Sequence, residues 1–109
     1  MNQDEIPPGT LSLLILKALW RGGELHGYEI ASWIEQVSED VLRVQEGSLY
    51  PALQRMLVKG WVAAKWGVTA GNRRARYYRL TPLGRKQLEV EVSQFERVVQ
   101  AITRAIQTA

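Results

Sequence analysis

Apolar residues recur at helical spacing in four stretches of the chain, and the first two stretches predict a pair of helices. Residues 11–20 are apolar on nearly every side, follow Thr10 as a candidate N-cap, and stop at two consecutive glycines. A helix of this kind must be covered on several sides. A second helix is predicted over residues 27–37, because Ile30 and Ile34 lie four positions apart on one face.

A third helix is predicted from residue 48 to residue 59, ending at a glycine. Ser48 is expected to be its N-cap, which places Pro51 in the first turn, where the missing N–H has no intrahelical partner. A helical projection puts Gln54 and Arg55 on the side opposite to the apolar residues. The face predicted to join the core consists of Leu49, Ala52, Leu53, Met56 and Leu57.

Residues 61–66 and 74–80 predict two strands joined by a turn. Both segments are rich in aromatic and β-compatible residues, and the segment between them contains glycine and asparagine. Alternation along the second strand directs Tyr78 inward and Tyr77 outward. Arginines cluster in and just before this strand, so the tip of the predicted hairpin is strongly cationic.

Thr81 and Pro82 mark the start of a final helix predicted over residues 83–106, because threonine can cap a helix and proline fits its first position. Its apolar residues form a heptad seam. The helix would be roughly 35 Å long, more than a small core can cover, so we predict a symmetric dimer, with packing wholly within one chain as the alternative. The residues assigned to dimerisation are Leu14, Leu88, Val92, Phe95, Val99, Ile102 and Ile106.

Length and composition narrow the class of protein. The chain has 109 residues, enough for one domain, with no cysteine and a single histidine, so we predict no disulfide, no metal site and no cofactor. That histidine, His26, is interpreted as a structural hydrogen-bond donor. The N-terminus lacks the pattern of a signal peptide, and the apolar run at 11–20 is too short for a membrane span. We therefore expect a cytoplasmic protein with no membrane partner.

Charges are segregated along the chain. The net charge is +3, yet residues 47–88 contain nine of the fourteen lysines and arginines and no acidic residue, which leaves five basic and eleven acidic residues elsewhere. A surface that lies against phosphates excludes carboxylates, whereas a surface that only confers solubility mixes both signs. This acid-free segment comprises the third helix, the hairpin and the first turn of the last helix.

Three helices, a basic hairpin and a long helix follow one another in the order of a winged helix-turn-helix. In that fold the third helix enters the DNA major groove, and the hairpin, called the wing, lies over the adjacent backbone or minor groove. We therefore predict a mainly α (α+β) fold with a two-stranded β-wing. The expected division is a flexible N-terminal tail at 1–9, a DNA-binding domain at 10–82 and a dimerisation helix at 83–109.

Three motifs in this order also resemble the PadR family of bacterial transcriptional regulators. They are LHGYEI at 25–30, GSLYPAL at 47–53, and RYYRLT at 76–81 followed by Gly84 and Arg85. The resemblance covers nearly the whole chain from Leu11 onward, and the single C-terminal helix is similar to that of the shorter subfamily. It implies a homodimer that binds operator DNA, mostly as a repressor, and that releases the DNA when a small aromatic effector such as a phenolic acid binds.

Matched residue by residue, the resemblance implies DNA contacts by the third helix and by the wing. Ser48 at the helix start suits a phosphate, and Gln54 can present a donor and an acceptor to a base edge. Tyr50 lies at the border of the apolar face, so a core position and a DNA contact are both open for it. The residues assigned to double-stranded DNA, in an inverted-repeat operator, are Gly47, Ser48, Tyr50, Pro51, Gln54, Arg55, Lys59, Arg73, Arg74 and Arg76.

Other functions explain the sequence less well. A winged helix that binds only protein would keep the fold but would not need an acid-free surface. RNA binding is disfavoured because the major groove of A-form RNA is too narrow for a helix. An enzyme is not predicted, because the chain lacks cysteine, a glycine-rich phosphate loop and paired carboxylates outside acidic surface helices. The four tryptophans are interpreted as core residues rather than as the lining of a ligand pocket.

Overall fold

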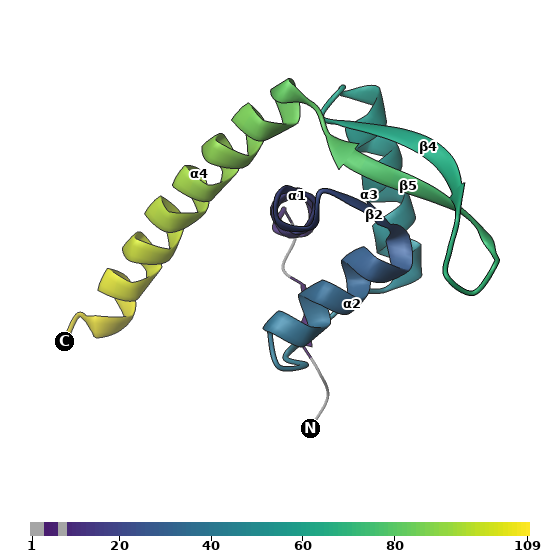
Figure 1. The fold of residues 1–109 in the computed structure, drawn as a ribbon. Coiled ribbons are helices and arrows are strands. Elements are labelled where there is room, and N and C mark those ends of the chain that lie inside the picture. The colour runs from purple at the N-terminus through teal and green to yellow at the C-terminus, as the bar shows by residue number, and fades with distance from the viewer. Residues whose placement is uncertain (1–3, 7–8) are drawn as a thin grey trace.

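A computed structural model describes residues 4–6 and 9–109, which form a cluster of short elements from which one long helix projects (Figure 1). The order of helices and hairpin is the predicted one, and the winged helix-turn-helix fold is confirmed. In chain order the elements are β1 (Asp4–Glu5), α1 (Leu11–Gly22), β2 (Glu24–His26), α2 (Gly27–Val37), β3 (Leu42–Arg43), α3 (Glu46–Val58), β4 (Val62–Val68), β5 (Arg74–Leu80) and α4 (Pro82–Gln107).

Helix α1 is the centre of the core. Its residues Ile15, Leu16, Ala18 and Leu19 are buried. The helix packs against α2, α3, α4 and β5, and Figure 1 shows it end-on among these elements. Gly23 ends it, because a positive φ of 80° lets the Gly23 N–H donate to the carbonyl of Leu19 at 2.8 Å. The helix that is apolar all round is therefore covered on several sides, as its sequence predicts.

The predicted hairpin is present and gains a third strand. Strand β5 pairs antiparallel with β4 on one side and with β2 on the other. The sequence did not reveal β2, because three residues are too few to show alternation. Tyr78 of β5 lies opposite Ala64 and Leu25 and is buried, whereas Tyr77 is partly exposed. The predicted inward orientation of Tyr78 is confirmed.

The start of α3 differs from the prediction. The helix begins at Glu46, and the carbonyl of Gln45 accepts a hydrogen bond from the Ser48 N–H at 3.0 Å. Ser48 is therefore in the first turn, and its assignment as the N-cap is wrong. The same shift moves Pro51 from the first turn into the helix, where its ring nitrogen cannot donate the hydrogen bond that the carbonyl of Gly47 would accept.

Contacts across the turn between α2 and α3 hold the segment that precedes α3. Oε2 of Glu35 in α2 accepts a hydrogen bond from the Val44 N–H at 3.0 Å, and Oε1 lies 3.6 Å from the guanidinium of Arg43. Glu39 and Asp40 have positive φ values of 52° and 63° and reverse the chain direction. The carboxylate thus holds the segment just before α3, and no local pattern reveals such a contact.

Part of the predicted N-terminal tail belongs to the fold. Asp4 and Glu5 form β1, which pairs in parallel with Leu42 and Arg43 of β3, and Ile6 packs against the core. The predicted tail over residues 1–9 therefore has main-chain pairing at Asp4 and Glu5; residues 1–3 and 7–8 lie outside the described part of the chain. Main-chain pairing requires no side-chain pattern, so the sequence did not show it.

Thr81 caps α4 as predicted and ties the helix to the preceding elements. Its Oγ1 accepts a hydrogen bond from the Gly84 N–H at 3.0 Å and donates one to the carbonyl of Gly60 at 2.6 Å. Gly84 is buried, and a Cβ atom there would overlap the main-chain oxygen of Trp61. Among the residues described, no helix, α4 included, is both long and apolar enough to cross a membrane.

We expect Gly84→Ala to lower the free energy of unfolding by about 3 kcal/mol, because the methyl group fits only if the backbone moves. Gly47→Ala is the matched control, since a Cβ there meets no atom within 4 Å and alanine favours a helix by up to about 1 kcal/mol over glycine. Urea denaturation followed by circular dichroism measures both variants. Wild-type stability of Gly84→Ala would contradict the close packing of α4.

Candidate nucleic-acid interface

The start of α2, helix α3 and the hairpin β4–β5 border one cleft of about 880 Å³, which we call the wing cleft. Its lining combines three arginines with five aromatic residues. The cleft brings the three predicted wing residues together with Tyr50 of α3. These cationic and aromatic residues are Arg73, Arg74, Arg76, Tyr28, Tyr50, Trp66, Tyr77 and Tyr78.

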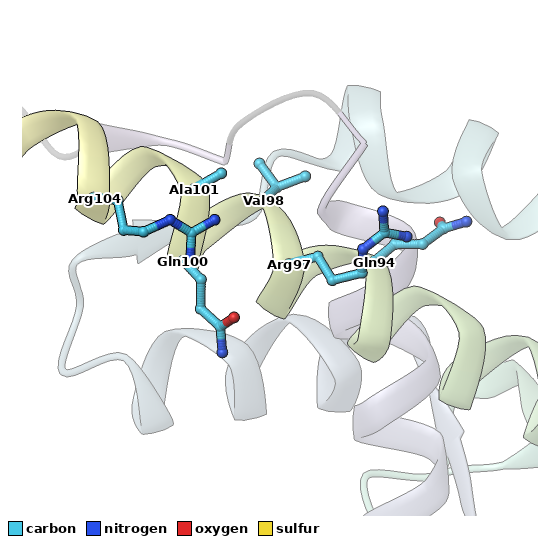
Figure 2. Close-up of a pocket in the computed structure, with 6 residues that line it drawn as sticks. All are labelled: Gln94, Arg97, Val98, Gln100, Ala101 and Arg104. Atoms are coloured by element: carbon cyan, nitrogen blue, oxygen red, sulfur yellow. The ribbon is translucent and has the colours of Figure 1, made fainter.

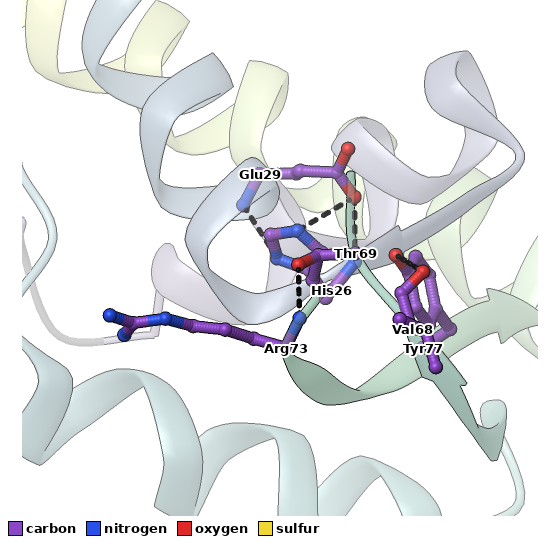
Figure 3. A network of polar contacts seen from close by, with 6 residues as sticks. All are labelled: His26, Glu29, Val68, Thr69, Arg73 and Tyr77. Carbon is purple, nitrogen blue, oxygen red and sulfur yellow. Dashed lines mark hydrogen bonds and ion pairs between the residues drawn. The ribbon is translucent and has the colours of Figure 1, made fainter. Parts of the chain in front are cut away.

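His26 and Glu29 form a capping box at the start of α2 (Figure 3). Nδ1 of His26 accepts a hydrogen bond from the Glu29 N–H at 3.4 Å, and the His26 N–H donates to Oε1 of Glu29 at 3.0 Å. The imidazole also meets the Tyr77 ring edge-on, with centroids 5.3 Å apart. A structural role for His26 is confirmed, but its side chain accepts the capping hydrogen bond, so the prediction that it donates is corrected.

Tyr50 joins α3 to the start of α2. A Cβ atom added at Gly27 would lie 2.7 Å from the Tyr50 hydroxyl, so the absence of a side chain at Gly27 makes room for the tyrosine ring. Tyr50 is 47% exposed. The sequence left a core position and a DNA contact open for Tyr50. In the structure its ring packs on Gly27, and its exposed part lines the wing cleft.

Hydrogen bonds within the turn hold the tip of the wing (Figure 3). The Thr69 N–H donates to the carbonyl of Arg73 at 2.8 Å. Oγ1 of Thr69 accepts a hydrogen bond from the Arg73 N–H at 3.2 Å, which is the bond drawn between these residues in Figure 3. Asn72 has a positive φ of 61°, a conformation that asparagine tolerates well in turns. This closed turn holds the main chain of Arg73 beside the cleft.

One face of the hairpin carries arginines stacked on aromatic rings. The guanidinium carbon of Arg74 lies 4.4 Å from the centroid of the Trp66 ring, and that of Arg76 lies 6.0 Å from the Tyr78 ring. Burial raises the pKa of the Tyr78 hydroxyl, and the positive charge of Arg76 partly offsets this effect. Trp66 is 58% exposed and Trp20 51% exposed, so the interpretation of all four tryptophans as core residues is wrong.

The wing arginines are not neutralised by acidic side chains. In the part of the chain that the structure describes, no ion pair involves Arg73, Arg74 or Arg76. By contrast, Lys65 of the same hairpin lies 3.3 Å from the carboxylate of Glu24. Glu29 also lines the cleft, but its carboxylate contacts His26 rather than an arginine. Positive charge that no carboxylate pairs with attracts phosphate and raises the rate of encounter with a polyanion. The wing cleft therefore suits a nucleic-acid backbone.

Helix α3 buries its predicted apolar face and exposes the opposite one. Gln54 and Arg55 are exposed, together with Gly47, Ser48 and Pro51 near the helix start. These residues form the exposed α3 surface that a DNA base or backbone could reach.

Lys59 lies apart from the other residues assigned to DNA. Its ammonium lies 4.6 Å from the centroid of the Trp61 ring, and it lines a groove of about 410 Å³ between α1 and α4. The structure thus divides the predicted DNA-binding set among the α3 surface, the wing cleft and, for Lys59, this separate groove.

The predicted seam of α4 divides into a covered part and an exposed part. Leu88 is buried within its own chain, and Leu14 and Val92 pack partly against the same core. Leu88 therefore belongs to the core of the single chain, because α4 packs on α1. The part of the seam that stays exposed consists of Phe95, Val99, Ile102 and Ile106.

A further groove, of about 730 Å³, follows the C-terminal half of α4 (Figure 2). Two glutamines and two arginines extend beside the small apolar side chains there. None of its lining residues is aromatic, whereas the groove between α1 and α4 contains Trp61 and Phe95. Of the two grooves, only the latter has walls suited to an aromatic molecule. The residues shown in Figure 2 are Gln94, Arg97, Val98, Gln100, Ala101 and Arg104.

The chain is similar to known regulators in sequence and in structure. The model of the transcriptional regulator PadR-like family matches residues 15–90. Transcriptional regulator Rv3488 of Mycobacterium tuberculosis is 34% identical over 80 residues, covering 72% of this chain and 70% of that protein. A transcriptional regulator from Clostridium thermocellum, Cth-833, superposes with a TM-score of 0.80 at 28% identity, covering 88% of this chain and 92% of that chain. Bacillus subtilis PadR, solved in complex with operator DNA, superposes with a TM-score of 0.68 at 25% identity, covering 80% of this chain and 48% of that chain.

We expect His26→Ala to lower the free energy of unfolding by about 1 kcal/mol, because the Glu29 N–H loses its capping acceptor. His26→Asn is the control, since its side-chain oxygen can accept the same hydrogen bond and should restore most of the stability. Urea denaturation of both variants at neutral pH provides the measurement. An equal loss in the two variants would show that the ring contact with Tyr77, and not the cap, is what matters.

Proposed function

The chain belongs to the PadR-like family of transcriptional regulators, and on this premise we propose that it binds double-stranded operator DNA as a homodimer. Helix α3 enters the major groove, and the wing lies over the adjacent backbone. The observation that carries the proposal is the wing cleft, where three arginines without acidic partners face the same space as the start of α2 and Tyr50 of α3.

Residues of α3 and the wing have different tasks in this complex. Gln54 and Arg55 on the exposed face of α3 reach base edges, and Gln54 can donate and accept at once. Ser48 and the wing arginines contact phosphates and orient the protein. The open space around Gly47 supports a close approach of the DNA to the helix start, since a Cβ atom there would meet no atom of the described residues within 4 Å.

A second copy of the chain is the partner we propose for α4. The exposed part of its seam is an apolar stripe that begins at Phe95, and Ile102 and Ile106 on it are 53% and 77% exposed. A two-fold dimer through this stripe would cover it in both copies and would present two α3 helices about 34 Å apart, matching an inverted repeat. On this division, residues 10–82 contact DNA and residues 83–109 form the dimerisation helix.

We propose a repressor whose release is controlled by a small aromatic effector. The groove between α1 and α4 supports this, because Trp61 and Phe95 line it beside the dimer helix. A molecule bound there would contact α4 directly and change the relative position of the two DNA-binding units. Its effect would be a shift between dimers that fit the operator and dimers that do not.

Replacement of Arg73, Arg74 and Arg76 by alanine together is expected to weaken DNA binding at least about a hundredfold. It should also make the plot of log affinity against log salt concentration less steep, reducing the magnitude of its negative slope by about five for a dimer, because up to six phosphate contacts are lost. Fluorescence anisotropy with a fragment selected from genomic DNA by the wild-type protein provides the measurement. Arg79→Ala is the control, since Arg79 is exposed but does not line the wing cleft. An unchanged affinity and slope in the triple variant would exclude the DNA-binding wing.

Ile102→Asp is expected to convert the dimer into a monomer and to weaken operator binding at least about tenfold, because a charge would be buried in the apolar stripe and the two half-sites would no longer be bound together. Gln100→Asp introduces the same charge on the opposite side of α4 and should leave both properties unchanged. Sedimentation velocity gives the oligomeric state. A wild-type monomer, or a dimeric Ile102→Asp variant, would contradict dimerisation through this stripe.

A further inference from the structure

We propose that Trp66 is a positioning residue of the wing, which holds the Arg74 guanidinium in place for the DNA backbone. This inference rests on the proposed DNA binding and adds a residue that neither the motifs nor the charge pattern selects. Its basis is the stacked pair itself: the guanidinium carbon of Arg74 lies 4.4 Å from the centre of the Trp66 ring, and both residues line the wing cleft.

The pairing of the two strands explains how the stack forms. Trp66 lies opposite Arg76, and Val68 lies opposite Arg74, so Arg74 is the diagonal neighbour of Trp66 on the same face of the hairpin. This face belongs to the core at its base, where Tyr78 is buried, and leaves the core toward the tip. Trp66 is more than half exposed, so its side chain contributes little to the core. Core packing therefore does not explain a tryptophan at this position, whereas the contact with Arg74 does.

Stacking leaves the binding groups of arginine available. When a guanidinium stacks on an aromatic ring, its flat face lies on the ring and its five N–H donors point outward along the edges, where they can reach phosphate oxygens. An arginine on an exposed strand otherwise samples many rotamers and loses that freedom when it binds. A partner that holds the side chain before DNA arrives therefore lowers the cost of the contact, and tryptophan is the strongest such partner among the aromatic residues.

The experiment compares Trp66→Ala, Arg74→Ala and the double variant, using the operator fragment selected by the wild-type protein. We expect Trp66→Ala to weaken binding about tenfold, which corresponds to one lost stack in each of two subunits. It should reduce the salt dependence in the same direction as Arg74→Ala. In the Arg74→Ala background, Trp66→Ala should have little further effect, since a positioning residue has nothing left to position.

Two controls separate this role from a structural one. Trp66→Phe keeps an aromatic face and should bind within about threefold of wild type. Trp20→Ala removes another exposed tryptophan, whose ring lies 4.0 Å from the Lys17 ammonium. Because Trp20 is in α1 and does not line the wing cleft, this variant should bind DNA as tightly as wild type. Thermal unfolding of every variant verifies that the wing is intact.

The outcomes are distinguishable from failure of the proposed function. If the wild-type protein selects no DNA, the proposed function itself is wrong, and this inference falls with it. If the wild-type protein binds DNA and Trp66→Ala binds equally well, only the role of Trp66 is overturned. A full additional loss from Trp66→Ala in the Arg74→Ala background would also overturn it, because the ring would then act independently of Arg74.

Discussion

Burial of α1 is the constraint on which the rest of the structure depends. This helix is apolar on nearly every side, so it is stable only when other elements surround it. Helices α2, α3 and α4 and strand β5 all pack on it. Because these four elements share one core helix, packing on α1 determines their relative positions. It therefore also determines how far the start of α2, the exposed face of α3 and the wing lie from one another.

Polar and aromatic contacts then hold the parts of the wing cleft in place. The capping box of His26 and Glu29 fixes the start of α2, and the Tyr50 ring packs on Gly27 where a side chain would be in its way. Pairing of β2 with β5 anchors the wing to the same region. None of these contacts uses the guanidinium group of a wing arginine, yet they determine where the arginines are presented.

The same requirement for burial explains why α4 has two parts. Where the helix lies over α1, its seam is covered by its own chain, and Leu88 is buried. Beyond Phe95 the helix extends past the core (Figure 1), and none of the residues that the structure describes buries the continuing apolar stripe. One uninterrupted heptad pattern therefore contains a part that packs in the core of its own chain and a part that stays exposed. The extent of the core determines where the first part ends and the second begins.

The sequence by itself determined the helices, the hairpin, the cap of Thr81 and the segregation of charge, because periodicity and capping depend on residues that are neighbours in the chain. It could also identify most of the candidate site through the motifs around Gly27, Tyr50 and Arg76. Only the tertiary structure decided that β2 joins the sheet and that α3 starts before Ser48. It alone also decided that Lys59 lies in another groove and that the Arg74 guanidinium lies over the Trp66 ring. Each of these depends on contacts between elements, and such contacts arise only when the whole chain packs around α1.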